Sequence, residues 1–238
     1  MALTYTSYVA QLSNLLVIGS TDANFITFLP GCIDYAEGRC LRELDLLATR
    51  VTDSSGSLVA GTRTFTLPTA SGTFVVVEEM NAITPAGTAA ATGVRNPLTA
   101  VSKEWIDAVY PSAAQYRALP AFFSMMSNTQ VVLGPSPDAA YVMEVTGTIR
   151  PTALSSTNTT TFLTTNLPDL FICASMVFAS GYTRDFGAQS DNSQQAQSWE
   201  SQYKTLFGSA GVEELRKRYQ SQGWTSQIPN PIATPPRA

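Results

Sequence analysis

The chain of 238 residues contains no histidine. Histidine is the commonest general base, metal ligand and pH switch in proteins, so its absence removes the most frequent catalytic and metal-binding arrangements. Cysteine is scarce too. Cys32, Cys40 and Cys173 fit neither a disulfide framework nor a zinc site in number or spacing. We therefore expect buried thiols in a reducing compartment, no cofactor, no metal and no enzymatic activity.

Charged residues make up only 13 % of the chain, whereas about a quarter is usual in a soluble domain. A monomer normally needs more charge to stay soluble, so we expect copies of the chain or other partners to cover much of its surface. The net charge of -4 and the isoelectric point of about 4.8 argue against a nucleic-acid reader with a basic face.

Long apolar runs are also missing. The longest uncharged one lies between Asp169 and Arg184 and is shorter than the ~20 residues that a membrane-spanning helix needs. It predicts a buried helix, and we expect no membrane partner. The first residues carry no basic run before an apolar core, so we expect no signal peptide.

Apolar residues recur every three or four positions up to residue 48, which is typical of helices. Gly19 ends the first predicted helix, and Asp22 is placed to cap a second one. Pro30-Gly31 is expected to interrupt that helix, and a third one with a mixed-charge face continues to about Leu47.

Residues 49–166 are rich in Thr, Val, Gly and Pro and show short alternating runs, which are typical of strands. Asp53-Ser-Ser-Gly56 is a predicted turn. Residues 102–110 predict a short helix, and residues 84–93 predict a loop. The predicted strands cover residues 63–67, 74–78, 130–133 and 140–150.

Helical periodicity returns over residues 167–222. Pro168 lies in the first turn of a helix that we expect to reach about Phe186 and that is apolar on nearly all sides, as the centre of a bundle would be. A second helix is amphipathic and extends beyond Gly211. The following segment, residues 223–238, holds four prolines and cannot be helical.

The order of these zones predicts an α+β fold. Residues 1–48 and 167–222 would form one helical bundle, because the apolar helix after Pro168 needs neighbours and the first helices are the best candidates. The antiparallel β-rich domain of residues 49–166 would be inserted between them, and residues 223–238 would form an extended C-terminal tail.

Carboxylate pairs are the remaining route to catalysis. Glu78 and Glu79 would point to opposite faces of a strand, which makes them a poor pair. Asp34 and Glu37 lie one helical turn apart, and we interpret them as part of a salt-bridged helix face that includes Arg39, Arg42 and Glu43.

Two apolar features suggest contacts. The cluster of Trp199, Tyr203 and Phe207 predicts a helix face that is buried in its own bundle, or else a contact between subunits. In the tail, Trp224 and Ile228 are apolar anchors on a proline-stiffened segment. This segment is either a frayed end or a peptide that binds in a partner's groove.

Three stretches, residues 28–48 (FLPGCIDYAEGRCLRELDLLA), 134–141 (GPSPDAAY) and 167–174 (LPDLFICA), carry a family resemblance. Their order and spacing resemble the head-to-tail adaptor, or connector, proteins of short-tailed bacteriophages over residues 5–210.

The resemblance implies a virion structural protein of the neck that is assembled in the host cytoplasm. Such proteins form a ring, commonly of twelve copies, below the portal protein. The ring extends the channel for genomic DNA without reading its sequence, and it offers a platform to tail and nozzle proteins. The resemblance also implies portal contacts near the C-terminus, which we assign to Tyr219, Trp224, Ile228, Pro229, Ile232 and Arg237.

Two alternatives remain open. One is another neck or tail-completion protein, such as a stopper or tail tube. The other is a carbohydrate-binding module or a carboxylate glycoside hydrolase that is built on the β zone. Its sugar-stacking side chains would be Trp105, Tyr110 or Tyr116.

Overall fold

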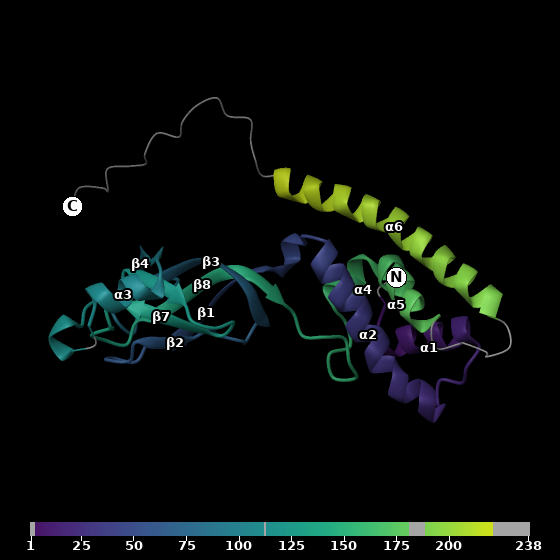
Figure 1. The fold of residues 1–238 in the computed structure, drawn as a ribbon, viewed down its shortest axis with the longest axis horizontal. Helices are drawn as coiled ribbons and strands as arrows, with labels where there is room; N and C mark the ends of the chain where they lie inside the picture. Colours follow the sequence, from purple (N-terminus) through teal and green to yellow (C-terminus); the bar gives the residue numbers. More distant parts are fainter. Residues whose placement is uncertain (1–2, 112, 181–188, 221–238) are drawn as a thin grey trace.

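The computed structural model describes residues 3–111, 113–180 and 189–220. It confirms the α+β class: helices from both ends of the chain form a bundle, and the strands lie beside it (Figure 1). The bundle helices are α1 (Tyr5–Leu16), α2 (Ala23–Glu43), α4 (Phe162–Asn166), α5 (Pro168–Ala179) and α6 (Gln189–Tyr219).

Helix α2 begins where the sequence predicts. The Asp22 carboxylate accepts hydrogen bonds from the backbone N–H groups of Asn24 at 2.9 Å and Phe25 at 3.0 Å. These N–H groups lack partners within the helix, so the side chain satisfies them as an N-cap.

The predicted break at Pro30 is wrong, because α2 runs through it without interruption. Proline inside a helix costs about 3 kcal/mol, and tertiary packing must offset that cost. The Phe178 ring of α5 stacks on Phe28 at 5.4 Å and on Tyr35 at 5.1 Å, so it holds α2 on both sides of the proline. An ideal Cβ built at Gly31 would lie 3.5 Å from the same ring.

Helix α2 also ends earlier than predicted, at Glu43 rather than near Leu47. Leu44 and Leu46 continue as extended chain, yet both remain buried in the bundle core. A short 3₁₀ helix, η1 (Leu47–Thr49), leads into the strands. The apolar spacing therefore indicated burial correctly but not the helix end.

Helix α5 occupies the centre of the bundle, as its apolar sequence predicts. It packs against α1, α2, α4 and α6, and the Tyr8 hydroxyl of α1 donates a hydrogen bond to Ser175 at 2.9 Å. The helix ends at Ala179, before the predicted end near Phe186, which lies outside the described residues.

The strands form two four-stranded sheets, in the orders β1-β8-β3-β4 and β2-β7-β6-β5. All neighbours are antiparallel except β5 and β6, which are parallel. The four predicted strands are present as β2 (Thr64–Thr66), β3 (Thr73–Thr84), β7 (Gln130–Gly134) and β8 (Val142–Arg150). The strands without a prediction are β1 (Arg50–Ser57), β4 (Val94–Pro97), β5 (Thr99–Ala100) and β6 (Phe122–Met125).

Strand β1 contains the predicted turn Asp53–Gly56, so that prediction is wrong. The pairing of β1 with β8 shifts register between Asp53 and Gly56, which marks a bulge. The Asp53 carboxylate accepts hydrogen bonds from the Ser55 N–H at 2.8 Å and hydroxyl at 2.6 Å. These turn-forming residues thus bend a strand instead of ending it.

The predicted helix near residue 105 is α3 (Lys103–Val109), and Ser102 caps it. Asp107 on this helix pairs with Arg63 at 2.7 Å and with Lys103 at 2.8 Å. The pair with Arg63, which directly precedes β2, attaches α3 to the sheets, whereas the pair with Lys103 lies within the helix. Between β5 and β6 there is also a short 3₁₀ helix, η2 (Ala114–Tyr116).

The buried apolar residues form two separate clusters. One lies within the bundle and includes residues from both ends of the chain, among them Phe25, Phe171 and Tyr203. The other lies between the sheets and includes Phe65, Met80 and Leu133. Helix α6 crosses the bundle and ends at the junction between the two parts (Figure 1).

Candidate functional site

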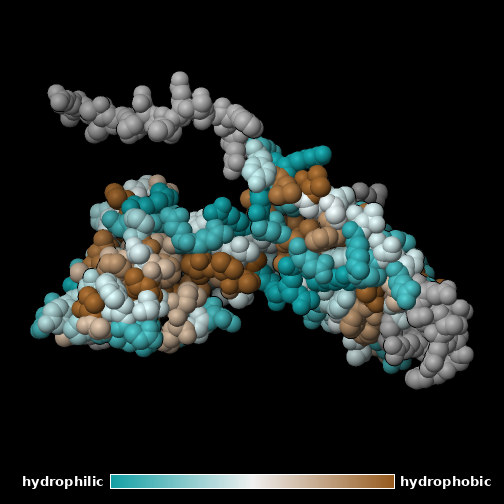
Figure 2. Space-filling view, turned by 45° about the horizontal axis from the view of Figure 1, so that its top comes forward, coloured by the Kyte–Doolittle hydropathy of each residue, from teal (hydrophilic) through white to brown (hydrophobic). Residues whose placement is uncertain are grey.

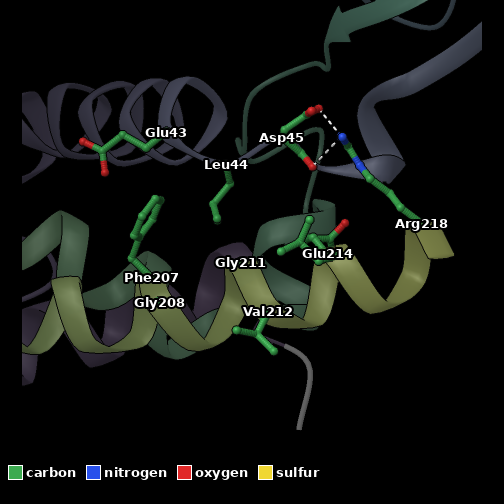
Figure 3. A pocket seen from close by; sticks show the side chains of 10 residues that line it. Glu43, Leu44, Asp45, Phe207, Gly208, Gly211, Val212, Glu214 and Arg218 are labelled. Carbon is green, nitrogen blue, oxygen red and sulfur yellow. Dashed lines mark hydrogen bonds and ion pairs between the residues drawn. The ribbon is translucent and has the colours of Figure 1, made fainter. Parts of the chain in front are cut away.

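The surface around the junction is hollowed by three grooves, and Asp45 lines all of them. The groove between the end of α2 and α6 has a volume of about 420 Å³ (Figure 3). Phe207 projects from α6 toward Glu43, and Leu44 points toward α6. The groove is lined by Glu43, Leu44, Asp45, Phe207, Gly208, Gly211, Val212, Glu214, Leu215 and Arg218.

An interhelical contact holds α6 on α2. The Arg39 guanidinium binds both carboxylate oxygens of Glu200, at 2.6 and 2.8 Å, and lies 3.9 Å from the centre of the Tyr203 ring. The Tyr203 hydroxyl donates a hydrogen bond to Glu43 at 2.7 Å. Arg39 lowers the pKa of the Glu200 carboxyl, whereas burial and the bond to Glu43 raise the pKa of Tyr203.

The inner face of the last turns of α6 holds the chain that follows α2. Glu214, which is 4 % exposed, accepts hydrogen bonds from the Leu47 N–H at 3.0 Å and from Lys217 at 2.8 Å. Arg218 forms an ion pair with the Asp45 carboxylate and donates a hydrogen bond to the Asp45 carbonyl at 3.0 Å (Figure 3). This ion pair raises the pKa of Arg218.

The outer face of the same turns carries three exposed apolar side chains beside Arg216. Val212, Leu215 and Tyr219 are 48 %, 53 % and 62 % exposed. Their spacing of three and four residues puts them in one stripe along the helix. In Figure 3, Val212 points away from α2, and Figure 2 shows hydrophobic surface near the end of α6. We call these three residues the α6 stripe.

Of the residues predicted to contact a portal, Tyr219 lies in the α6 stripe. The other five, Trp224, Ile228, Pro229, Ile232 and Arg237, lie outside the described residues. In the aromatic cluster, Tyr203 is buried, and Trp199 and Phe207 are half-buried against the bundle core. This arrangement favours the interpretation that the cluster belongs to its own bundle.

The predicted carboxylate pairs do not converge. Glu78 pairs with Arg50 at 2.6 Å, whereas Glu79 accepts a hydrogen bond from Asn81 at 2.9 Å. Asp34 is exposed, but Glu37 is only 7 % exposed and accepts a hydrogen bond from the backbone. The predicted salt-bridged face is therefore right for Arg39 and Glu43 and wrong for Glu37, and Arg42 instead donates a hydrogen bond to the Gly38 carbonyl at 2.8 Å.

The three cysteines are buried and unpaired, as predicted. Burial raises the pKa of Cys32 and of Cys40 to about 12, which keeps both thiols protonated and unreactive at neutral pH. In the described part of the chain, no cluster of three or more cysteine or acidic residues could hold a metal ion. Among the described helices, none has the length and hydropathy to cross a membrane.

A family model described as SU10 adaptor protein matches residues 3–229. The chain belongs to this family. The match confirms the resemblance to phage adaptors and supports a structural role in the virion. It covers the bundle, the sheets and the α6 stripe. A search of curated proteins finds no match.

Two of the three aromatic residues proposed for sugar stacking contact Phe122. Trp105 packs edge-on against Phe122 at 4.9 Å, and Tyr110 stacks on the same ring at 5.8 Å. Tyr110 therefore presents a ring face to Phe122, whereas Trp105 remains 40 % exposed. Tyr116, which is exposed, lies outside this cluster.

Sequence reasoning missed three buried glutamates. Glu37 and Glu214 each lie at a buried phase of their helix. Glu144 accepts two hydrogen bonds from Arg95, at 2.8 and 2.9 Å, and one from Asn81 at 3.3 Å. The sequence does indicate that Glu214 is buried, because it follows Tyr203, Phe207 and Ala210 at helical spacing.

Proposed function

We propose that the protein is the head-to-tail adaptor of a short-tailed phage, and that it acts as a ring bound below the portal. The ring would extend the DNA channel and support the tail and nozzle proteins. Membership of the adaptor family supports the general role. The number of copies would follow the dodecameric rings of the proteins that the sequence resembles.

The exposed α6 stripe is the observation that best supports a portal contact. Its three apolar side chains are exposed at the end of a helix, next to the segment that contains Trp224 and Ile228. Exposed apolar residues that line up on one face commonly mark a protein-binding surface. The stripe and the tail would together dock on the portal, and multiple copies in a ring would strengthen each contact through multivalency.

The scarcity of charge fits this role. A ring subunit covers its lateral faces with neighbouring copies and its axial faces with other neck proteins. An acidic chain also does not bind phosphates through clustered lysine and arginine side chains, so DNA would pass without being retained.

The test is co-sedimentation of the full chain with portal rings of the same phage. We expect Leu215→Asp and deletion of residues 224–238 each to weaken binding at least tenfold, while Val59→Asp leaves it unchanged. Val59 is a matched control, because it is 65 % exposed but lies in the β region. Portal binding at wild-type strength by both altered chains would refute the proposed contact. Binding to a tail component but never to portal would favour the stopper or tail-tube alternative.

A further inference from the structure

Two chain segments connect the bundle to the β region: residues 44–49, between α2 and β1, and residues 151–161, between β8 and α4. A buried glutamate of the bundle holds each of them by a backbone N–H. Leu47 donates to Glu214 of α6 at 3.0 Å, and Leu154 donates to Glu37 of α2 at 3.0 Å. Both connections thus share one kind of contact, and Arg218 additionally holds the first connection through Asp45.

Apolar side chains anchor the connections as well. Leu44, Leu46 and Leu154 are 6 %, 1 % and 3 % exposed and belong to the bundle core rather than to the core between the sheets. The glutamates beside them are 7 % exposed for Glu37 and 4 % for Glu214. A buried carboxylate is costly unless it is hydrogen-bonded, so the two backbone bonds account for its presence there.

The two glutamates differ in how their charge is compensated. Glu214 pairs with Lys217 at 2.8 Å, whereas the ion pairs of the described residues include none with Glu37. Burial raises the pKa of Glu37 to about 7, the Leu154 bond opposes that rise, and Asp34 adds to it. The Glu37 contact is therefore the weaker of the two.

The chain beyond these contacts belongs to the β region. Arg50, the first residue of β1, is already paired with Thr148 of β8. The buried clusters of bundle and sheets share no residue. The two held segments are therefore the mechanical joint between parts that each have their own core.

We propose that Glu37 and Glu214 form a two-point latch that sets the orientation of the β region on the bundle. Loss of either contact lets the β region swing more widely about the connecting segments, and loss of both frees it further, while both cores remain folded. The latch does not depend on which partner the protein binds.

Pulsed electron paramagnetic resonance on the full chain tests the latch. Spin labels at Ile26→Cys on α2 and Val94→Cys on β4 report the distance between the two parts, since both sites are more than half exposed. The native thiols are buried. We expect a single narrow distance distribution with the latch intact and at least a twofold broader one in Glu37→Ala/Glu214→Ala. The matched control is Glu213→Ala, because Glu213 is exposed and precedes Glu214 on α6.

A second variant removes a donor rather than a carboxylate, in case the double variant does not fold. Leu47 is the first residue of η1, where proline is well tolerated, and Leu46 before it has φ -78° and ψ 126°, which a following proline permits. Leu47→Pro should broaden the distribution, whereas Leu47→Ala, which keeps the N–H, should not. In Glu37→Gln/Glu214→Gln, each side chain keeps a carbonyl oxygen that can accept the backbone hydrogen bond. The distance distribution of this variant should therefore stay narrow. An unchanged width in a folded double alanine variant would overturn the proposal, and so would an unchanged width in Leu47→Pro if the double variant does not fold.

Discussion

At the scale of single residues, burial of Glu37 shifts the pKa of its carboxyl into a range where pH affects stability. Its pKa rises from 4.5 to about 7, chiefly because burial disfavours the charged form. The folded state therefore binds a proton that the unfolded state releases between these values. Stability from this group is complete below about pH 4.5 and is lost as the pH rises through about 7.

This sign gives a prediction for Glu37→Gln. Relative to the wild type, the variant should gain stability as the pH rises from 5 to 8, and each kcal/mol gained would raise Tm by about 2–4 °C in a chain of this size. The measurement is thermal unfolding at several pH values. No histidine contributes in this range, which makes the trend easy to assign. Glu104→Gln, at an exposed site on α3, is the control. Parallel pH profiles of wild type and Glu37→Gln would contradict the prediction.

Local chemistry explains which residues were predictable. Asp22 and Ser102 cap helices through their own neighbours, so the sequence alone indicates them. Glu37 and Glu214 are bound by backbone groups more than a hundred residues away. Their helical phase marks them as buried, but only the assembled bundle shows which N–H groups they accept.

At the scale of elements, α6 depends on the contact that attaches it to α2. Tyr203 is 1 % exposed and stacks under Arg39. Trp199 is only half-buried. The two aromatic residues should therefore contribute unequally to stability.

We predict that Tyr203→Ala lowers the free energy of unfolding by about 3–5 kcal/mol, as does loss of a large aromatic side chain from a core. Trp199→Ala should cost less, about 1–3 kcal/mol, because part of its surface already faces water. Urea denaturation gives both values. A larger loss of unfolding free energy in Trp199→Ala than in Tyr203→Ala would show that burial does not determine how much each residue stabilises the protein.

The errors in element boundaries have a common cause. Pro30 and the Asp53–Gly56 segment carry strong local signals for a break, yet one lies inside α2 and the other inside β1. Phe178 holds the helix across Pro30, and the Phe65 ring packs so close to Gly56 that a Cβ would lie 2.7 Å away. Phe178 lies far from Pro30 in the sequence, and Phe65 lies on the next strand, β2, so the local propensity of either segment could not anticipate these contacts.

At the scale of the whole molecule, the bundle should fold without the β region. Its core draws only on residues before β1 and after β8. Arg50 and Thr148 are paired neighbours across β1 and β8 and lie about 5 Å apart, so the two ends of the intervening chain are close together.

We predict that a chain in which a short glycine-serine loop replaces residues 50–150 keeps a cooperative helical transition. Circular dichroism at increasing temperature measures it, with the full chain as reference. A non-cooperative loss of helical signal would show that the sheets are required to fold the bundle.

Of the candidate site, the sequence predicted only Tyr219. The grooves form where the end of α2 approaches α6, and the sequence alone does not show that approach.

The ion pairs described above also have a consequence for any polyanion near the protein. At least eight of the 14 lysine and arginine side chains are paired with carboxylates within the molecule: Arg39, Arg50, Arg63, Arg95, Lys103, Lys204, Lys217 and Arg218. Few ammonium or guanidinium groups are left to displace condensed counterions from a nucleic acid. Electrostatic drag on a strand that slides past the protein should therefore be small, and it should change little with ionic strength.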